Sequence, residues 1–383
     1  MRSTALFYLL VLTATARAQE VVRFVQSHRV TDIQKYRSGE SYRNCDCAFR
    51  DDETFLCVHP TKRGGELQFC SIRKNEVVRT AIPEPKAFKP KFDWDHYFHG
   101  PHIWPNARGD LFILWTVGGN GEHGLALHSK ESNKFRCDIS YRPLQSFSKA
   151  VGDADGSWYL VRWAGDLAVY RVDVEKEFDL EALGFHEGLG YHRYGVVDAC
   201  LRAKGILHCI YAQVEEAIAI RRLRFHAVDF DIAKKSWSER RTLFDQNDSV
   251  SSAHPRVVML EGKPHYFWSI DWRKDKTPGG GLHYLADGKT TSVRLADSRQ
   301  FEVLAIGKKI VVCYTIEGKI DQVFFRVIEA GIVGPESSVK ISNRYDYSLW
   351  GEDMVLGNAG RDRLWFVNAK EINKFYELKI ERP

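Results

Sequence analysis

Three features of the 383-residue sequence predict an all-β fold. Aromatic residues make up 13% of the chain, and aromatic and β-branched side chains favour strands. The 29 Gly and 12 Pro supply many turns. Apolar runs are short, and helical periodicity is confined to Glu175–Leu183. The hydrophobic fraction of 44% and the charged fraction of 27% are those of an ordinary globular protein, which excludes a disordered chain.

One unit recurs along the chain: an apolar run, a turn, and a second apolar run that contains an aromatic residue. The turns centre on glycines spaced 45 to 57 residues apart, at Gly109, Gly156, Gly205, Gly262, Gly307 and Gly360. An earlier copy has its turn at Asp51-Asp52. Third and fourth alternating segments complete each unit, and four short strands per about 50 residues are typical of a propeller blade. The sequence therefore predicts a seven-bladed β-propeller of four-stranded antiparallel blades, with a β-sandwich as the alternative.

The first twenty residues predict a secretory signal peptide. Arg2 gives the positive start, Ala5–Thr13 is the apolar core, and Ala16 and Ala18 are the small residues of a cleavage site. The apolar run is shorter than the roughly 20 residues that span a bilayer, and an N-terminal anchor is the alternative. We expect a signal peptide at 1–18, one propeller domain at 19–383 with an N-terminal arm over about 19–44, and a secreted or periplasmic product.

The eight cysteines indicate disulfides, since an even number in an exported chain permits them. The four between residues 45 and 70 could form two local bridges, and Cys200 and Cys209 could pair across a hairpin. A metal site at Cys45-x-Cys47 is the alternative, but no second pair at zinc spacing follows it. Cys313 is expected to be a buried free thiol. We predict no metal site and no cofactor, while a divalent cation could still act structurally or neutralise charge.

The charge and hydropathy of the chain exclude two classes of partner. A formal net charge of +5 is too small for a protein that binds nucleic acid through charge alone. No segment after the signal peptide approaches the length of a membrane span. We expect a monomer that binds an acidic polysaccharide or another glycan.

The segments that lead into the first strand of each repeat are rich in His, Tyr and Arg. In a propeller these innermost strands surround the axis, so their lead-ins build one face. Arginine engages carboxylates through two N–H groups, and aromatic faces pack on apolar ring surfaces. Histidine is a suitable base and tyrosine a suitable acid for proton transfer. The predicted catalytic residues are His99, His102, Tyr191, Tyr194 and His254. The predicted substrate-binding residues are Arg193, Arg256, Arg299, Arg344, Tyr347 and Trp350. For any single one of them, a hydrogen bond to a neighbouring loop is the alternative.

The segment His99–Glu131 has a histidine-bearing first strand (His102), a glycine turn (Gly109), an aromatic strand (Leu111–Trp115) and a Gly-Asn-Gly loop at 119–121. In these features it resembles secreted propellers of the BNR-repeat, sialidase-like superfamily, and among these the seven-bladed polysaccharide lyases that act on ulvan and similar uronate polymers. The hairpin at Asp229–Asp245, closed by Trp237, resembles a degenerate Asp box. The resemblance implies a catalytic His, a Tyr and a uronate-binding Arg, matched by His99 or His102, Tyr191 or Tyr194, and Arg193 or Arg256, with His254 as a further candidate.

These features together favour an enzyme that cleaves a uronate-containing polysaccharide by β-elimination. A sialidase-type glycoside hydrolase is one alternative, because Asp198, Glu302, Glu352 and Asp353 could supply the two carboxylates that hydrolysis needs. The arginine triad and the Tyr-Glu pair of a true sialidase are not recognisable in this sequence. A non-catalytic glycan-binding propeller is the second alternative.

Overall fold

The structure, a computed structural model of the whole chain, describes twenty segments. These are residues 19–29, 45–50, 53–58, 68–73, 76–82, 102–117, 122–140, 149–163, 166–173, 178–186, 197–217, 220–247, 253–270, 280–298, 300–316, 318–319, 321–341, 354–358, 362–368 and 374–382. The predicted signal peptide, residues 1–18, lies outside them. In the described part of the chain no helix is long and apolar enough to cross a membrane.

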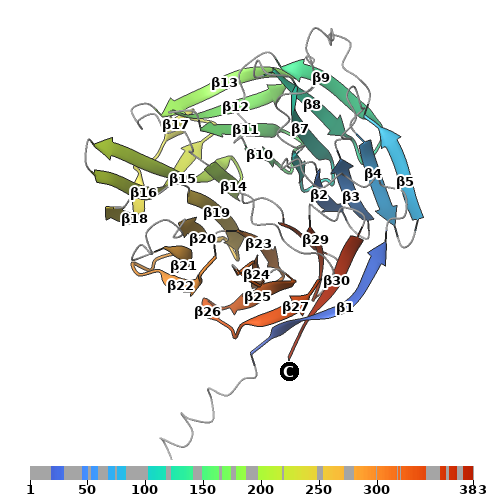
Figure 1. Cartoon of the computed structure of the whole chain (residues 1–383). Helices are drawn as coiled ribbons and strands as arrows, with labels where there is room; N and C mark the ends of the chain where they lie inside the picture. The colour runs from blue at the N-terminus through green and yellow to red at the C-terminus, as the bar shows by residue number, and fades with distance from the viewer. Residues whose placement is uncertain are drawn as a thin grey trace, which may run out of the picture.

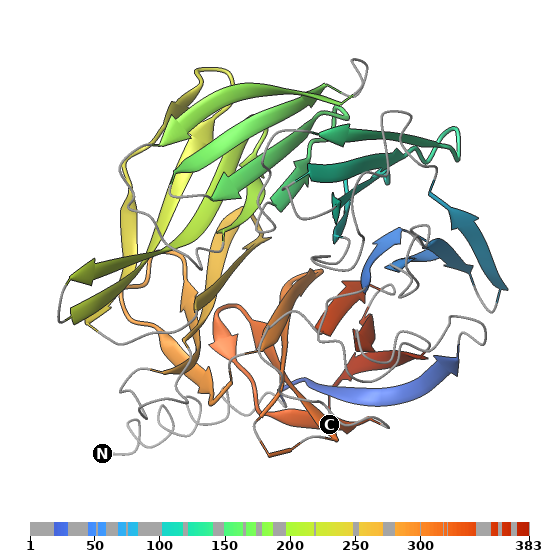
Figure 2. The ribbon, with the colours of Figure 1, turned by 45° about the horizontal axis from the view of Figure 1, so that its top comes forward.

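The described strands form seven antiparallel sheets, here called blades 1 to 7, which are arranged around one axis (Figures 1 and 2). The innermost strands are β2, β6, β10, β14, β19, β23 and β28. Each contacts the innermost strand of the next blade, and β28 contacts β2, so that the ring closes. An isolated sheet leaves both faces exposed, whereas radial stacking buries them between neighbours. The predicted all-β propeller is confirmed, and the β-sandwich alternative is wrong.

The first three blades each have four strands in sequence order, from the innermost outward. Blade 1 consists of β2 (Cys45–Arg50), β3 (Glu53–Val58), β4 (Gln68–Arg73) and β5 (Glu76–Ala81). Blade 2 consists of β6 (His102–Pro105), β7 (Leu111–Val117), β8 (Glu122–His128) and β9 (Phe135–Ser140). Blade 3 consists of β10 (Lys149–Gly152), β11 (Trp158–Trp163), β12 (Leu167–Asp173) and β13 (Asp179–His186).

Blades 4 and 6 differ from the four-stranded prediction, because their outer strand is interrupted and forms two short strands that pair with the same neighbour. Blade 4 consists of β14 (Val197–Ala203), β15 (Ile206–Ala217), β16 (Ile220–Asp231), β17 (Ser236–Trp237) and β18 (Arg241–Asn247). Blade 5 consists of β19 (Ala253–Leu260), β20 (Lys263–Ile270), β21 (Gly281–Ala286) and β22 (Val293–Ala296). Blade 6 consists of β23 (Phe301–Ile306), β24 (Lys309–Tyr314), β25 (Gln322–Glu329), β26 (Ile332–Val333) and β27 (Ser337–Lys340).

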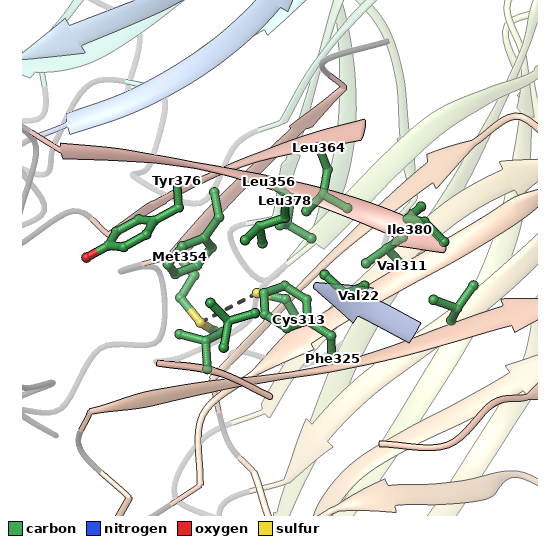
Figure 3. Close-up of a cluster of buried hydrophobic side chains, with 14 of the residues drawn as sticks. Val22, Val311, Cys313, Phe325, Met354, Leu356, Leu364, Tyr376, Leu378 and Ile380 are labelled. Carbon is green, nitrogen blue, oxygen red and sulfur yellow. Dashed lines mark hydrogen bonds between the residues drawn. The ribbon is translucent and has the colours of Figure 1, made fainter. Parts of the chain in front are cut away.

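Blade 7 joins the two ends of the chain. It consists of β28 (Met354–Asn358), β29 (Arg363–Asn368), β30 (Lys374–Glu381) and, as its outermost strand, β1 (Val21–Arg29). Val22 of β1 is buried in a hydrophobic cluster between blades 6 and 7, near Val311 and Ile380 (Figure 3). Part of the segment expected as an N-terminal arm therefore completes the last blade. Because the first strand pairs with the last, the ring is held closed by backbone hydrogen bonds.

The predicted turn glycines adopt positive φ angles wherever the structure describes them, at Gly109, Gly156, Gly205, Gly262 and Gly307. Each lies in the hairpin between the first and second strands of its blade. At Gly156 the φ angle is 95°, and a β-carbon added there would lie 2.6 Å from the Arg108 guanidinium. Glycine is the residue that adopts this backbone conformation without strain. The spacing of these glycines therefore marks the blade repeat for a physical reason.

Two predictions about local structure are wrong. Cys200 lies opposite His208 and Cys209 opposite Ala199, so a one-residue offset places the two cysteines on opposite faces of blade 4. Both are free thiols, as Cys313 is, which corrects the predicted hairpin disulfide. The side chains of the four cysteines between residues 45 and 70 lie outside the described part of the structure, so their pairing stays a prediction.

The short helix predicted over Glu175–Leu183 is also wrong, because residues 179–186 form strand β13. Leu180 packs in the core shared with blade 2, and Leu183 packs in the core shared with blade 4. Pairing with β12 and burial on both sides override the local helical pattern.

Candidate functional site

Four charged side chains lie on the innermost strands of four consecutive blades. Lys149 begins β10, Asp198 is the second residue of β14, Arg256 lies in β19, and Glu302 is the second residue of β23. These strands are neighbours in the ring around the axis. The charges therefore alternate in sign from blade 3 to blade 6, and we call the four residues the axial cluster.

Asp198 is the buried link between blades 3, 4 and 5. Its Oδ1 lies 3.1 Å from the Nζ of Lys149, and its Oδ2 accepts a hydrogen bond of 2.9 Å from the backbone N–H of Val257. The Asp198 side chain is only 6% exposed, whereas that of Lys149 is 31% exposed. A buried carboxylate needs such partners, because burial without them costs its hydration. Asp198 therefore ties three innermost strands together.

Arg256 and Glu302 form the second half of the axial cluster. The Nε of Arg256 lies 3.6 Å from Oε2 of Glu302, and its Nη1 donates a hydrogen bond of 3.1 Å to the carbonyl oxygen of Pro255. The two side chains are 16% and 25% exposed, so each retains contact with solvent. A guanidinium can bind a carboxylate through two parallel N–H groups, which makes Arg256 a candidate for binding a sugar acid.

The pKa of Glu302 is raised above its usual value. Burial is the largest cause, and the positive charge of Arg256 opposes it in part. Lys149 also lowers this pKa and Asp198 raises it, so the four groups of the axial cluster interact electrostatically. The carboxyl group of Glu302 consequently takes up a proton at a higher pH than an ordinary glutamate does.

Three of the predicted site residues lie in the described part of the chain. His254 and Arg256 are two residues apart in β19 and therefore share one face of that strand. His102 begins β6, the innermost strand of blade 2, and its ring stacks on Trp104 with centroids 5.5 Å apart. The structure brings His254 and Arg256 together, while His102 lies three blades away around the ring. The remaining predicted residues lie outside the described residues: His99, Tyr191, Arg193, Tyr194, Arg299, Arg344, Tyr347 and Trp350.

The sequence analysis named Asp198 and Glu302 only as carboxylates for the alternative of hydrolysis, and it did not assign a role to Lys149. Each is a charged residue at the start of an otherwise apolar first strand, in KAVG, VDAC and FEVLAI. This departure from the apolar pattern is the signal that could have identified Lys149. Among the described residues, no group of three or more His, Cys, Asp or Glu is arranged to hold a metal ion.

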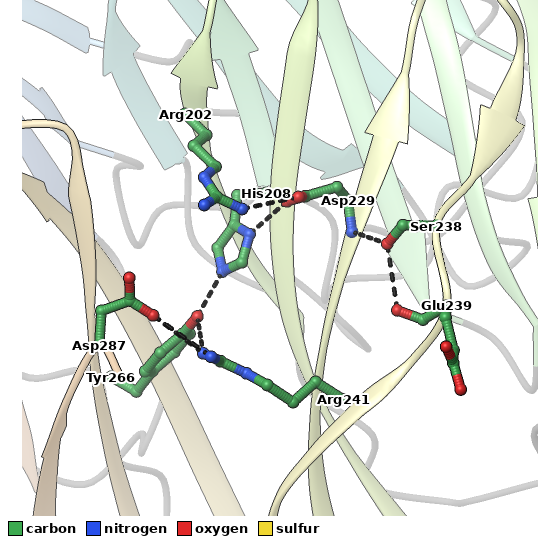
Figure 4. Close-up of polar contacts among 8 residues, drawn as sticks. All are labelled: Arg202, His208, Asp229, Ser238, Glu239, Arg241, Tyr266 and Asp287. Carbon is green, nitrogen blue, oxygen red and sulfur yellow. Dashed lines mark hydrogen bonds and ion pairs between the residues drawn. The ribbon is translucent and has the colours of Figure 1, made fainter. Parts of the chain in front are cut away.

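A second polar network lies between blades 4 and 5, and apart from Arg202, near the end of β14, its residues lie outside the innermost strands (Figure 4). His208 on β15 is bonded through Nδ1 to Oδ1 of Asp229 at 2.5 Å and through Nε2 to the hydroxyl of Tyr266 at 2.9 Å. Arg202 pairs with Asp229 at 2.8 Å, and Arg241 donates to the Tyr266 hydroxyl at 2.6 Å. Burial raises the pKa of Tyr266 to about 12. The two ring nitrogens of His208 thus bond to Asp229 in blade 4 and to Tyr266 in blade 5, so this network connects the two blades.

Asp229 makes the stability of this network depend on pH. Burial alone would raise the pKa of Asp229. The hydrogen bond and charge of His208 and the charge of Arg202 together lower this pKa by more, so the net shift is downward. A lowered carboxyl pKa stabilises the fold above the unfolded pKa of about 4 and ceases to do so as the pH falls through the folded pKa. We expect Asp229→Asn to lower the thermal unfolding temperature at pH 7, with the difference from wild type shrinking below about pH 4. A difference that stays constant down to about pH 3 in thermal scans would contradict this assignment.

The fold is shared with solved propellers at low sequence identity. Polysaccharide lyase Uly1 matches with a TM-score of 0.55 and 10% identity, over 94% of this chain and 99% of that chain. A PL25 ulvan lyase bound to GlcA(1-4)Rha3S matches with a TM-score of 0.53 and 10% identity, over 87% of this chain and 90% of that chain. The WD40 domain of Toxoplasma gondii coronin matches equally, with a TM-score of 0.53 and 10% identity, over 96% and 87%.

No protein-family model and no curated protein matches the sequence. One of these neighbours is a WD40 domain and two are lyases. The likeness therefore identifies the architecture, and the activity has to be argued from the site residues. The chain is similar in fold, over most of its length, to polysaccharide lyases and to other propellers.

Proposed function

We propose that this protein acts on an acidic, uronate-containing polysaccharide and cleaves it by β-elimination. The observation that carries the proposal is the placement of His254 and Arg256 on one face of β19, with Glu302 3.6 Å from the Nε of Arg256. A guanidinium that binds a sugar carboxylate places the adjacent carbon near an imidazole on the same strand face. The fold is that of known ulvan lyases, which supports the choice of chemistry.

The proposed reaction has three steps within one sugar unit. Arg256 binds the uronate carboxylate and neutralises its charge, which makes the proton on the adjacent carbon C5 more acidic. His254, on the same face of β19 as Arg256, removes that proton. The electron pair forms the C4–C5 double bond, the C4–O bond breaks, and Tyr191 or Tyr194 donates a proton to the leaving sugar oxygen. Water is not consumed, and the product carries an unsaturated uronate end.

Hydrolysis is a second candidate, and one observation favours it. Asp198 and Glu302 lie on innermost strands of the same half of the ring, and the pKa of Glu302 is raised by burial. Two carboxyl groups in different environments are the requirement of a glycosidase, where the one with the raised pKa acts as the acid. A binding propeller without activity is the third candidate.

The experiment is a screen of uronate polysaccharides, beginning with polymers of glucuronate and sulfated rhamnose of the kind seen in the neighbouring lyase. We expect ultraviolet absorbance from the conjugated uronate to rise in step with new reducing ends. New reducing ends without absorbance would assign hydrolysis. Binding with neither product would assign a lectin, and full elimination by His102→Ala and His254→Ala would show that the base lies elsewhere.

We also propose that the chain is exported, on the basis of the sequence of residues 1–18. Mass spectrometry of the N-terminus of the mature protein tests this, since cleavage after Ala18 is the expected result.

A further inference from the structure

Gln300 continues the innermost strand of blade 6 by one residue. The backbone N–H of Thr315 donates to the carbonyl oxygen of Gln300 at 3.3 Å, directly after the pairing of Phe301 with Tyr314. Side chains alternate along a strand, so Gln300 lies on the face of β23 that carries Glu302. Phe301, between them, is buried in the core shared with blade 5.

The side-chain amide of Gln300 is buried but only half used. The residue is 4% exposed, and the Thr315 hydroxyl donates to its Oε1 at 3.3 Å. Its Nε2 has no hydrogen-bond partner among the described residues. Native proteins pair nearly all buried polar groups, because an unpaired donor has lost its hydration without compensation. An unpaired buried N–H group beside a charged cluster therefore indicates a partner that arrives with a ligand.

The surroundings of this amide select the chemistry of that ligand. Glu302 is two residues further along the same face, roughly 7 Å between α-carbons in a strand, and its carboxylate meets the Nε of Arg256 at 3.6 Å. Gln300 thus places an unpaired N–H donor on the strand whose Glu302 contacts the guanidinium of Arg256. Carboxylate oxygens are acceptors only, so a carboxylate can accept from both donors.

We propose that Gln300 is a specificity-determining residue that donates its amide N–H to the carboxylate of the bound sugar acid, beside Arg256. This inference rests on the proposed function, whose site it extends by one residue. Gln300 is neutral, so it contributes selectivity for the carboxylate without altering the charge balance of the axial cluster. It also explains why the fold retains a buried amide whose N–H group is unpaired.

The test compares Gln300→Met with its parent for binding of a glucuronate tetrasaccharide and of the same tetrasaccharide with its carboxyl groups reduced to alcohols. The parent is the His254→Ala variant, and every other protein in the comparison carries this substitution too. Elimination then does not consume the ligand while binding is measured by calorimetry. We expect Gln300→Met to bind the acidic tetrasaccharide about tenfold more weakly and the reduced one as before. Its unfolding temperature without ligand should change little, because the substitution removes a buried unpaired donor but also the acceptor of the long Thr315 hydrogen bond.

Gln213→Met is the matched control. Gln213 is buried on β15, and its Oε1 accepts a hydrogen bond of 3.0 Å from Nε2 of His226. We expect this variant to unfold at a lower temperature and to discriminate between the two ligands as its parent does. A small stability change in Gln300→Met beside a larger loss in Gln213→Met distinguishes an amide with an unused N–H group from one that stabilises the fold.

Each other result has a definite meaning. If Gln300→Met binds the acidic tetrasaccharide as tightly as its parent, the inference is wrong and the proposed function stands. If its binding of both ligands falls equally and its unfolding temperature drops, Gln300 is structural and the inference is again wrong. If the parent protein binds neither ligand while wild type cleaves no uronate polymer, the proposed function itself fails and the inference fails with it.

Discussion

Arg256→Met is expected to reduce the initial rate of elimination on a uronate polysaccharide by about 10²- to 10³-fold, the usual effect of removing a group that stabilises developing charge. Glu302 loses its partner in this variant. The protein should still fold, because burial already raises the pKa of Glu302, so its carboxyl group can take up a proton. The measurement is the initial rate of ultraviolet absorbance increase. Arg256→Lys should recover part of the rate, since it restores the charge without the planar pair of N–H groups.

Arg241→Met is the matched control for this prediction. Arg241 also lies between two blades, but it pairs with Asp287 at 3.3 Å and with the Tyr266 hydroxyl, on strands outside the innermost ones. We expect its elimination rate to match wild type. Equal losses in the two variants would mean that Arg256 acts through stability, and an unchanged rate in Arg256→Met would remove it from the site.

Asp198→Ala is expected to give the largest loss of stability, about 3 kcal/mol in the free energy of unfolding. The substitution leaves the N–H of Val257 buried without its acceptor and removes the partner of Lys149. The shift of the urea unfolding midpoint measures the loss. Asp198→Asn, which keeps an oxygen acceptor and removes the charge, should lose less than half as much.

Asp166→Ala provides the comparison on the same type of ion pair at the surface. Asp166 pairs with Arg162 at 3.1 Å, and its side chain is 33% exposed. Partly exposed pairs of this kind contribute about 0 to 1 kcal/mol. A midpoint for Asp198→Ala as close to wild type as that of Asp166→Ala would show that the innermost strands are held by apolar packing alone.

The sequence predicted the architecture well, because each blade repeat contains a turn whose backbone conformation requires a particular residue type. A positive φ angle at a hairpin such as Gly205 or Gly262 requires glycine, so the blade spacing is visible in the order of residues. The same reasoning could not place Val21–Arg29 in blade 7, because its partner, Lys374–Glu381, lies at the other end of the chain. Pairing between distant segments leaves no periodic signal.

The site was predicted only in part, for a related reason. His254 and Arg256 were predicted because the segments that lead into the first strands are rich in His, Tyr and Arg, and the structure places both on one face of β19. Lys149 and Asp198 lie about one repeat apart in the sequence, on the first strands of two neighbouring blades. Their contact depends on how the blades are arranged in the ring and on the register of the strands. Strand register also explains why the predicted Cys200–Cys209 disulfide was wrong. The spacing of the hairpin alone suggested the pair, but a one-residue offset places the two cysteines on opposite faces.

The central claim is that the innermost strands of successive blades hold one site that binds the carboxylate of a sugar acid at Arg256. A crystal structure of the His254→Ala variant with a glucuronate tetrasaccharide tests it most directly. We predict the sugar at the end of the ring where the innermost strands begin, with a carboxylate oxygen within hydrogen-bond distance of the Arg256 guanidinium. A sugar bound at the outer edge of a blade, or at the opposite end of the ring, would contradict the claim.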